Sequence, residues 1–336
     1  MLCSRRRYGR YFNYFEDIDS MCGRAACTLD PDNICKACSF KDPNTKKYYA
    51  PQWINFNDNW NYKPSHNLAP TDVFPVLVSG KHFPNSVSTN EAVIHPMIWG
   101  MIPPWHKGSI NDHKLTTHNC RLEHITESRL YSEPLRHGSR CAMICDGFYE
   151  WQTTRGSRRQ PYFIFAPQDS GVKIEDESTW ENSWSEEKGW HGPKLLKIAG
   201  LFNTWKSAEG KTLYSFTIIT MESNESLSWC HHRMPAILDK EEDVANWLDF
   251  GKVTLKSALN LLQPVKCLSW YLVDTLVNNS RNKDPLCNKP LTTVKKSASS
   301  NLLTSWLKRK EENKERSQED GVTSSKLMKV VNIENE

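Results

Sequence analysis

RCAMICDGFYEW, the stretch from Arg140 to Trp151, predicts a buried strand that runs into an acidic, aromatic segment. Its first half is a nearly continuous apolar run, which is typical of a strand covered on both faces. Glu150 then stands among Phe148, Tyr149 and Trp151. Burial there would raise the pKa of the carboxyl group and suit a general acid. The alternative is a strand-end glutamate whose carboxylate reaches water.

Further strands are predicted on both sides of this stretch by short apolar runs between turn signals. Residues 168–193 are polar and poor in aliphatic side chains, which predicts an insertion loop outside the core. We expect helices around Cys35, after Arg121 as far as about Leu130, and from Ser257 to Leu262. The expected strands are 73–78, 92–94, 140–145, 161–166, 197–202 and 215–220.

Composition restricts the class of protein. The chain has 336 residues, 11 cysteines and a formal net charge of +4. No run of 18 apolar residues is present, so no membrane span is predicted. The odd cysteine count without a regular framework favours free thiols in a reducing compartment, the nucleus or cytosol. The mild positive charge is compatible with nucleic acid, and the 13 tryptophans would suit stacking on bases.

Met21-Cys22-Gly23-Arg24 has the form of a second start site. Residues 1–20 show no apolar periodicity, and we expect this leader to be absent from the active protein. A chain beginning at Cys22 would carry a thiol beside a free α-amine, whose pKa is about 7.7–8.0. An amine and a thiol so placed can capture an aldehyde, first as an imine and then as a five-membered thiazolidine ring.

Two other features have a structural and a functional interpretation. Cys35-Lys36-Ala37-Cys38 has zinc-like spacing, but no second pair follows, so buried thiols are predicted and neither a metal nor a cofactor is expected. The segment from Trp99 to Trp105 combines glycine and two prolines, which predicts a rigid loop presenting an aromatic side chain. Trp99 suits the core better than Trp105 does.

Four motifs occur in order along the chain. They are Met21–Arg24, Asn119-x-Arg121, Asp146–Trp151 and His231-His232-Arg233-Met234-Pro235. Together they resemble the SOS-response-associated peptidase (SRAP) family over about residues 21–285. The resemblance implies an α+β fold with a β-rich, partly barrel-like core of mixed and antiparallel strands. It also implies surrounding helices and a basic DNA-binding groove.

The function implied by the resemblance is covalent capture of abasic sites in single-stranded DNA. The open sugar of such a site carries an aldehyde, and Cys22 would form a thiazolidine crosslink with it. The crosslink would shield the lesion from cleavage and error-prone bypass at replication forks in the nucleus, and self-reversal is implied as well. Cys22 would supply the amine and thiol, Glu150 would transfer protons, His231 would assist ring opening, and Asn119 would orient the amine and sugar. We expect a monomer.

DNA contacts are implied residue by residue. Arg24, Arg121 and Arg233 suit phosphate binding, and Trp105 would stack on bases beside the lesion. Gly23, Asn67, Pro70 and Thr220 would complete the contact surface. Of the adjacent His231 and His232, only one can face the site if the backbone is extended, and the family pattern His-x-Arg-x-Pro selects His231.

The segment 286–336 is rich in Lys, Ser, Glu and Asn, which predicts a disordered tail. Within residues 300–310, Leu303, Trp306 and Leu307 resemble a motif that binds the replication sliding clamp, proliferating cell nuclear antigen. The usual leading Gln is replaced by Ser300.

Three other functions remain alternatives. Cys22 with His231 and Glu150 could form a cysteine peptidase, which would explain removal of the leader by self-cleavage. A non-covalent reader of 5-hydroxymethylcytosine would not need Cys22. A lyase that cuts at abasic sites would use the same imine as the crosslinking reaction.

Overall fold

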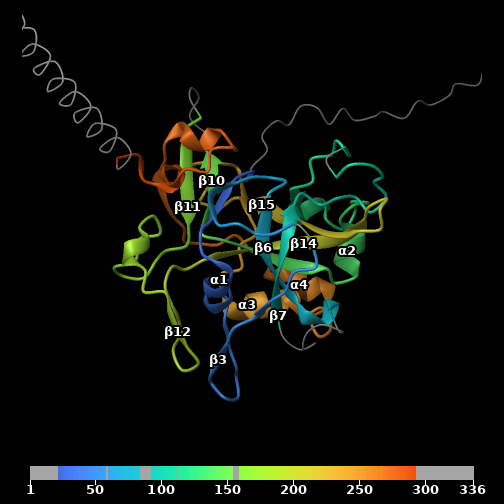
Figure 1. The fold of residues 1–336 in the computed structure, drawn as a ribbon, viewed down its shortest axis with the longest axis horizontal. Coiled ribbons are helices and arrows are strands. Elements are labelled where there is room, and N and C mark those ends of the chain that lie inside the picture. Colours follow the sequence, from blue (N-terminus) through green and yellow to red (C-terminus); the bar gives the residue numbers. More distant parts are fainter. Residues whose placement is uncertain (1–21, 58–59, 84–91, 111, 154–158, 293–336) are drawn as a thin grey trace, which may run out of the picture. The chain divides into compact units, whose positions relative to one another are not determined.

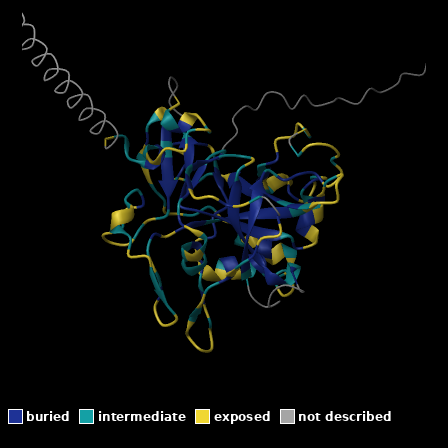
Figure 2. Ribbon diagram, viewed as in Figure 1, coloured by how far each residue is buried: buried dark blue, intermediate teal, exposed yellow. Residues whose placement is uncertain are grey.

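We analysed a computed structural model of the chain, which describes residues 22–57, 60–83, 92–110, 112–153 and 159–292 (Figure 1). Most buried residues lie in two β-sheets, whose strands are drawn dark in Figure 2. Trp99, Trp247, Arg140, Tyr149 and Phe74 are the largest fully buried side chains. No helix within the described ranges is long and apolar enough to cross a membrane.

The larger sheet closes on itself as a five-stranded barrel. Its strands follow the order β15-β14-β9-β6-β7, and β7 pairs in parallel with β15 to complete the circle. All other pairs within the circle are antiparallel. The barrel strands are β6 (Val73–Ser79), β7 (Ala92–Trp99), β9 (Arg140–Cys145), β14 (Leu196–Lys206) and β15 (Thr212–Glu222), and the attached strands are β4 (Gln52–Trp53), β8 (Asn119–Arg121) and β16 (Arg233–Pro235).

The second sheet is antiparallel and has the order β17-β11-β10-β1-β5. One of its faces, which includes Tyr149 and Phe163, packs in a separate small core. Its strands are β1 (Ala25–Cys27), β5 (Ser65–Leu68), β10 (Gly147–Trp151), β11 (Pro161–Phe165) and β17 (Ser269–Leu272).

Residues 140–151 connect the two sheets. They form β9, which lies between β14 and β6 in the barrel, and then β10, the middle strand of the second sheet. Only Asp146 separates the two strands. A Cβ atom on Gly147 would lie 2.5 Å from the Ile164 carbonyl oxygen, so any larger residue would separate β10 from β11. The single stretch therefore fixes how the two sheets meet.

Short helices and hairpins surround the sheets (Figure 1). The α-helices are α1 (Pro31–Ala37), α2 (Ser132–Arg136), α3 (Glu241–Leu248) and α4 (Leu255–Leu261), and 3-10 helices cover Gly80–His82, Leu122–His124, Glu177–Thr179, Thr275–Asn278 and Pro285–Asn288. Two hairpins, β2 (Phe40–Lys41) with β3 (Tyr48–Tyr49) and β12 (Ser183–Ser185) with β13 (Gly189–His191), project together. They are joined by a Lys47–Glu186 ion pair of 2.9 Å.

The predicted β-rich, partly barrel-like class is confirmed, and each predicted strand is present, β7, β14 and β15 being longer than expected. The helix predicted after Arg121 is wrong. Residues 119–121 form β8, a 3-10 turn follows, and only Ser132–Arg136 is α-helical. Residues 122–130 form this 3-10 turn and the turns that follow it, so the local helical pattern does not extend into an α-helix. The predicted 168–193 loop contains the β12–β13 hairpin.

Asp146 is a buried carboxyl group at the junction of the two sheets, with 1% of its surface exposed. Its Oδ2 accepts a hydrogen bond of 2.8 Å from the Thr28 hydroxyl, and its backbone N–H donates to the Ala26 carbonyl. Within the described residues, Oδ1 has no hydrogen-bond partner. Burial raises the pKa of Asp146 to about 7. The folded protein therefore retains a proton that the unfolded chain releases above about pH 4.

Asp146→Asn is expected to change how stability depends on pH. Because the native protein binds the extra proton, the Asp146 contribution to stability falls as pH rises from about 4 to about 7. Between these pH values, the free energy of unfolding of the variant should therefore rise relative to that of the parent by on the order of 3–4 kcal/mol. Denaturant titrations at several pH values measure the difference. The exposed Asp112→Asn is the control, and a pH-independent difference for Asp146→Asn would contradict the assignment.

Candidate active site

Cys22 and Glu150 meet near the end of β10. The Cys22 backbone nitrogen donates a hydrogen bond of 3.0 Å to Glu150 Oε2, and its Sγ lies 3.5 Å from the same oxygen. Both residues are almost fully buried, with 2% and 3% of their surfaces exposed. The position follows from strand pairing, because β1, which begins at Ala25, lies antiparallel to β10. Nitrogen and sulfur of one cysteine thus converge on one carboxylate oxygen.

The environment keeps the Cys22 thiol protonated. Burial raises the pKa of this thiol well above its usual value, and the neighbouring Glu150 carboxylate raises it further. The backbone of Cys22 is also unusual, since its φ of +47° lies in the left-handed region that non-glycine residues rarely adopt. The angle is a rotation about the N–Cα bond of Cys22, and a side chain in this region costs about 1–2 kcal/mol.

His231 is buried with 2% exposure, whereas the adjacent His232 is exposed. The Arg233 backbone N–H donates a 3.1 Å hydrogen bond to His231 Nδ1. Because Nδ1 accepts, the neutral ring carries its proton on Nε2 and is a donor there. Cys230, the preceding residue, is close enough to Glu150 for the carboxylate to help burial raise its thiol pKa to about 12. The residue before His231 is therefore close enough to Glu150 for the two side chains to interact electrostatically.

Asn119 lies in β8 opposite Ile218 of β15 and is half-buried. Its backbone carbonyl accepts a hydrogen bond of 3.3 Å from the Tyr131 hydroxyl. The neighbouring His118 was not predicted. Burial lowers the pKa of its imidazole to about 4, and Nε2 would lie 3.9 Å from a Cβ atom on Gly23. His118 also lines a cavity of about 350 Å³, together with Pro70, Thr71, Trp99 and Thr117 among others.

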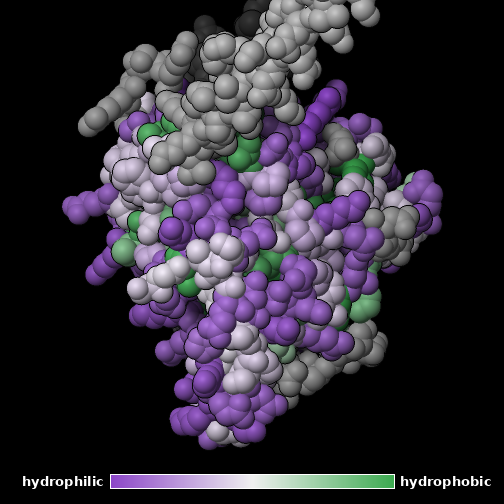
Figure 3. Space-filling model, turned by 60° about the vertical axis from the view of Figure 1, so that its left-hand side comes forward, coloured by the Kyte–Doolittle hydropathy of each residue, from purple (hydrophilic) through white to green (hydrophobic). Residues whose placement is uncertain are grey.

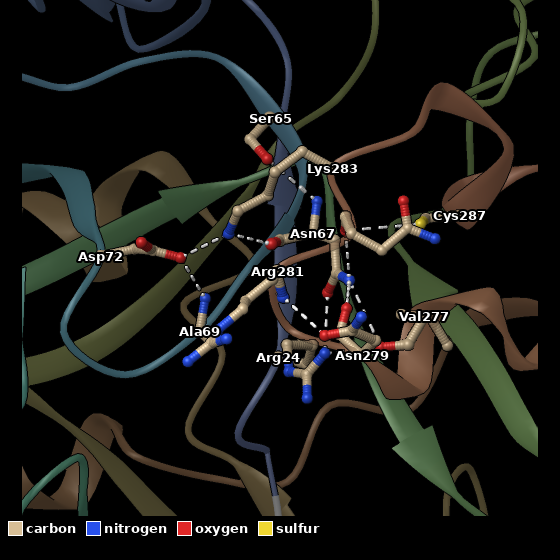
Figure 4. Close-up of polar contacts among 11 residues, drawn as sticks. Arg24, Ser65, Asn67, Ala69, Asp72, Val277, Asn279, Arg281, Lys283 and Cys287 are labelled. Carbon is tan, nitrogen blue, oxygen red and sulfur yellow. Dashed lines mark hydrogen bonds and ion pairs between the residues drawn. The ribbon is translucent and has the colours of Figure 1, made fainter.

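Arg24 and Asn67 connect the cysteine segment to a loop far along the chain (Figure 4). The Arg24 guanidinium donates to Asn67 Oδ1 at 3.1 Å and to the Val277 carbonyl at 2.5 Å. Asn67 is fully buried, and its Nδ2 donates to the carbonyl oxygens of Val277, Asn279 and Asn282. The amide of Asn67 is therefore engaged by residues 277–282 in this structure, and its contact with DNA stays a prediction.

Lys283 secures the same loop from the other side (Figure 4). Its Nζ donates to the Asn67 carbonyl at 2.6 Å and forms a 2.7 Å ion pair with Asp72. Asp72 in turn accepts from the backbone N–H of Ala69, which precedes Pro70. The predicted contact residues Arg24 and Asn67 thus belong to one hydrogen-bonded frame, and Pro70 directly follows its member Ala69.

Arg233 is held by a carboxylate that sequence reasoning missed. Its guanidinium forms a bidentate pair with Glu123, at 2.6 and 3.1 Å, and also donates to the Thr220 carbonyl at 2.9 Å. Burial opposes ionisation of Glu123, but hydrogen bonds and the charge of Arg233 bring its pKa below the usual value. A phosphate at Arg233 would have to compete with Glu123. Arg121, by contrast, is exposed.

Trp105 is 42% exposed, and Trp99 is buried at 1%, as the sequence suggested. The Arg129 guanidinium lies 4.4 Å from the centroid of the Trp105 ring, within the range of a cation–π interaction. The loop bearing Trp105 is anchored by Trp205, whose Nε1 donates to the His106 carbonyl at 2.9 Å. An aromatic face is therefore presented from a fixed loop.

The structure brings Cys22, Glu150 and the Arg24–Asn67 frame together. Asn119 lies in β8, and His231 lies just before β16. Cys38 is buried and Cys35 is half-buried. No group of three or more His, Cys, Asp or Glu side chains suited to a metal ion occurs among the residues that the structure describes. The predicted clamp-binding residues Leu303, Trp306 and Leu307, and the leader 1–20, lie outside the described residues.

Comparisons with known proteins identify relatives across most of the chain. The family model described as SOS response associated peptidase (SRAP) matches residues 21–280. The abasic site processing protein HMCES of Xenopus tropicalis is 41% identical over 304 residues, covering 88% of each chain. The abasic site processing protein YoqW of Bacillus subtilis is 30% identical over 226 residues, covering 67% of this chain and 85% of YoqW.

Solved structures share the fold. A protein from Bordetella bronchiseptica matches with a TM-score of 0.53 and 18% identity, over 75% of this chain and all of that protein. A protein from Bacteroides thetaiotaomicron matches with a TM-score of 0.50 and 22% identity, over 67% of this chain and 85% of that one. At these identities the likeness concerns the architecture alone.

Asn67→Ala is expected to loosen the loop that follows β17. The change removes the amide NH2 group that donates to three carbonyls of the loop, and it removes the acceptor of Arg24, leaving buried polar groups without partners. We expect the free energy of unfolding to fall by about 2–3 kcal/mol and amide hydrogen exchange to accelerate across residues 275–283. The exposed Asn61→Ala is the matched control. Unchanged exchange in this loop would show that Asn67 does not hold it.

Proposed function

The chain belongs to the SOS response associated peptidase (SRAP) family, and we propose that it processes abasic sites in DNA by linking Cys22 covalently to them. The proposal is supported by relatives as distant as the bacterial YoqW and the vertebrate HMCES proteins, which share the name abasic site processing protein. The observation that carries the chemistry is the approach of both Cys22 nitrogen and Cys22 Sγ to Glu150 Oε2.

The proposed reaction joins an amine, a thiol and an aldehyde with loss of one water. The free nitrogen of Cys22 attacks C1′ of the opened sugar, and the resulting carbinolamine loses water to give an imine. Sγ then attacks the same carbon while its proton passes to the imine nitrogen. Glu150 is placed to carry that proton, because its Oε2 contacts both atoms. The product is a five-membered thiazolidine containing C1′.

His231 and Asn119 have supporting roles in the proposal. A neutral His231 whose Nδ1 accepts from Arg233 holds its proton on Nε2, which suits donation to the ring oxygen as the sugar opens. The same tautomer is poorly suited to removing a proton from Cys22, and the thiol pKa is raised. Both points favour aldehyde capture over a cysteine peptidase that uses a thiolate–imidazolium pair. Asn119 would orient the amine and the sugar.

The amine must be free for this reaction. While Met21 is attached, the Cys22 nitrogen is an amide and cannot form an imine. The left-handed φ of Cys22 is a strained backbone conformation, and a Cys22 with a free α-amine would not be subject to it. We therefore propose that active protein begins at Cys22, and that the segment before it is removed or never made.

The DNA partner is proposed to be single-stranded and the setting a replication fork in the nucleus. Arg24, Arg121 and Arg233 would bind phosphates, while Trp105 would stack beside the lesion. Gly23, Pro70 and Thr220 would line the strand's path. The sliding clamp is the proposed partner of Leu303, Trp306 and Leu307.

A crosslinking assay with abasic single-stranded DNA tests the chemistry. Protein beginning at Cys22, verified by intact mass, should give an adduct stable in SDS. Cys22→Ala should give none, because its α-amine can form only a reversible imine and no sulfur is present to close the ring. Protein retaining residues 1–21 should react only after trimming. Equal adduct formation by the trimmed and untrimmed proteins would overturn the mechanism.

The same assay distinguishes the alternatives. A non-covalent reader of 5-hydroxymethylcytosine would bind DNA equally well as Cys22→Ala and yield no adduct. A lyase would cut the strand. Cys22→Ser should form the imine but close the ring poorly, so it should leave more strand scission than the parent.

Glu123→Gln is expected to strengthen DNA binding. Removing the carboxylate releases Arg233 from its bidentate partner and leaves one more cation for phosphate. We expect about a three- to tenfold lower half-saturating DNA concentration and a steeper dependence on salt. A DNA with a tetrahydrofuran lesion, which has no aldehyde, measures this binding without crosslinking. Exposed Glu127→Gln is the control, and an equal effect of both variants would indicate only general charge.

A further inference from the structure

Three aromatic side chains form a cluster beside the candidate active site. Trp229 and Trp270 have ring centroids 4.4 Å apart, and Tyr162 lies 4.8 Å from Trp229 and 5.6 Å from Trp270. We call Tyr162, Trp229 and Trp270 the aromatic ledge. The three residues come from β11, from the turn before β16 and from β17, so only the fold brings them together.

The ledge is continuous with the catalytic face of the second sheet. Tyr162 is the cross-strand partner of Glu150, and residues directly opposite in antiparallel strands share one face. Leu272 pairs with Tyr162 and extends the same row to the edge strand. The residues adjacent to these along each strand point to the opposite face and pack in its separate core. They are Tyr149, Phe163 and Tyr271.

The turn carrying Trp229 is fixed against β10. The Gln152 side chain donates to the Trp229 carbonyl at 3.1 Å, and the Thr153 backbone donates to the Cys230 carbonyl at 3.0 Å. The Trp229 indole N–H donates to the Ser226 carbonyl at 3.0 Å. Trp229 is only two residues before His231, so the aromatic ledge begins close to a residue of the proposed reaction.

The outer end of the ledge is exposed. Trp270 has 49% of its surface exposed and Leu272 has 36%, while Tyr162 and Trp229 are half-buried. The molecular face drawn in Figure 3 is mainly hydrophilic, with only small hydrophobic patches. Rigid aromatic rings that are half covered and half open suit stacking on other flat groups.

We propose that the aromatic ledge binds unpaired bases of the DNA strand as it leaves the reaction site. This inference rests on the proposed function, and it adds a second stacking surface besides Trp105. Stacking on aromatic rings accepts any base, which suits a protein that must meet lesions in any sequence. Because Tyr162 shares the face of Glu150, a strand whose sugar reaches Cys22 has its next bases directed along that face.

Binding to strands of different length tests the ledge. Full-length chain and single-stranded DNA with one tetrahydrofuran lesion would be titrated by fluorescence anisotropy, with the strand on either side lengthened from about two to about eight nucleotides. On one side, lengthening should tighten binding of the parent about tenfold, since each stacked base contributes measurably. Trp270→Ala and Trp270→Leu should lose this gain, and Trp270→Phe should keep most of it.

The variants separate stacking from other roles. Leucine retains the apolar bulk without an aromatic face, so equal behaviour of Trp270→Leu and the parent would overturn the proposal. Tyr49→Ala, an exposed aromatic on the β2–β3 hairpin, is the control and should keep the length dependence. A change in sedimentation of Trp270→Ala with unchanged DNA binding would assign the ledge to protein association, which also overturns the proposal.

Failure of this inference is distinguishable from failure of the proposed function. The tetrahydrofuran lesion reports binding alone, and crosslinking of abasic DNA reports chemistry alone. A protein that crosslinks normally but shows no dependence on Trp270 retains the proposed function and lacks the ledge.

Discussion

A carboxylate withdrawn from water has to be surrounded by donors, and Glu150 imposes that requirement on this protein. Two of its donors are backbone N–H groups, those of Cys22 and of Trp151 next to it. The Cys22 donor is available only if β1 lies beside β10, and β10 takes its place because Asp146 and Gly147 carry the chain from the barrel into the second sheet. The architecture can therefore be understood as the means of bringing a chain segment near its start to one buried oxygen.

Arg24 and Arg233, two of the proposed phosphate-binding residues, already have partners within the protein. Arg24 is bound to Asn67 and two carbonyls of the 275–283 segment, and Arg233 is bound to Glu123 and Thr220. If they contact DNA as proposed, such pairing would hold each guanidinium in place beforehand and lower the ordering cost of binding. It would also limit the affinity, because a phosphate would have to replace an existing partner.

Apolar runs were sufficient to predict the barrel strands, because a buried strand has a local signature. The short strands β1, β5, β8 and β17 were not predicted, since they are defined by their pairing partners. The roles assigned to Cys22, Glu150, His231 and Asn119 came from the family resemblance and stay predictions. Barrel closure depends on parallel pairing of β7 with β15, which no short window of sequence contains. Glu123, His118 and the loop partners of Asn67 were missed because their importance arises from contacts over large sequence separations. The ledge was hidden for the same reason, since Tyr162, Trp229 and Trp270 have no common pattern along the chain.

The raised thiol pKa of Cys22 determines the order of the proposed steps. A protonated thiol is a poor nucleophile, so the amine attacks first and the aldehyde is held as an imine before sulfur reacts. In the proposed mechanism, protonation of the imine would place a cationic nitrogen within reach of Sγ and Glu150, and a nearby positive charge lowers a thiol pKa. The thiol would therefore become reactive only after an aldehyde has been captured. A buried cysteine that is inert by itself and activated by its own first product would avoid oxidation and unwanted adducts, so burial is compatible with the proposed covalent chemistry.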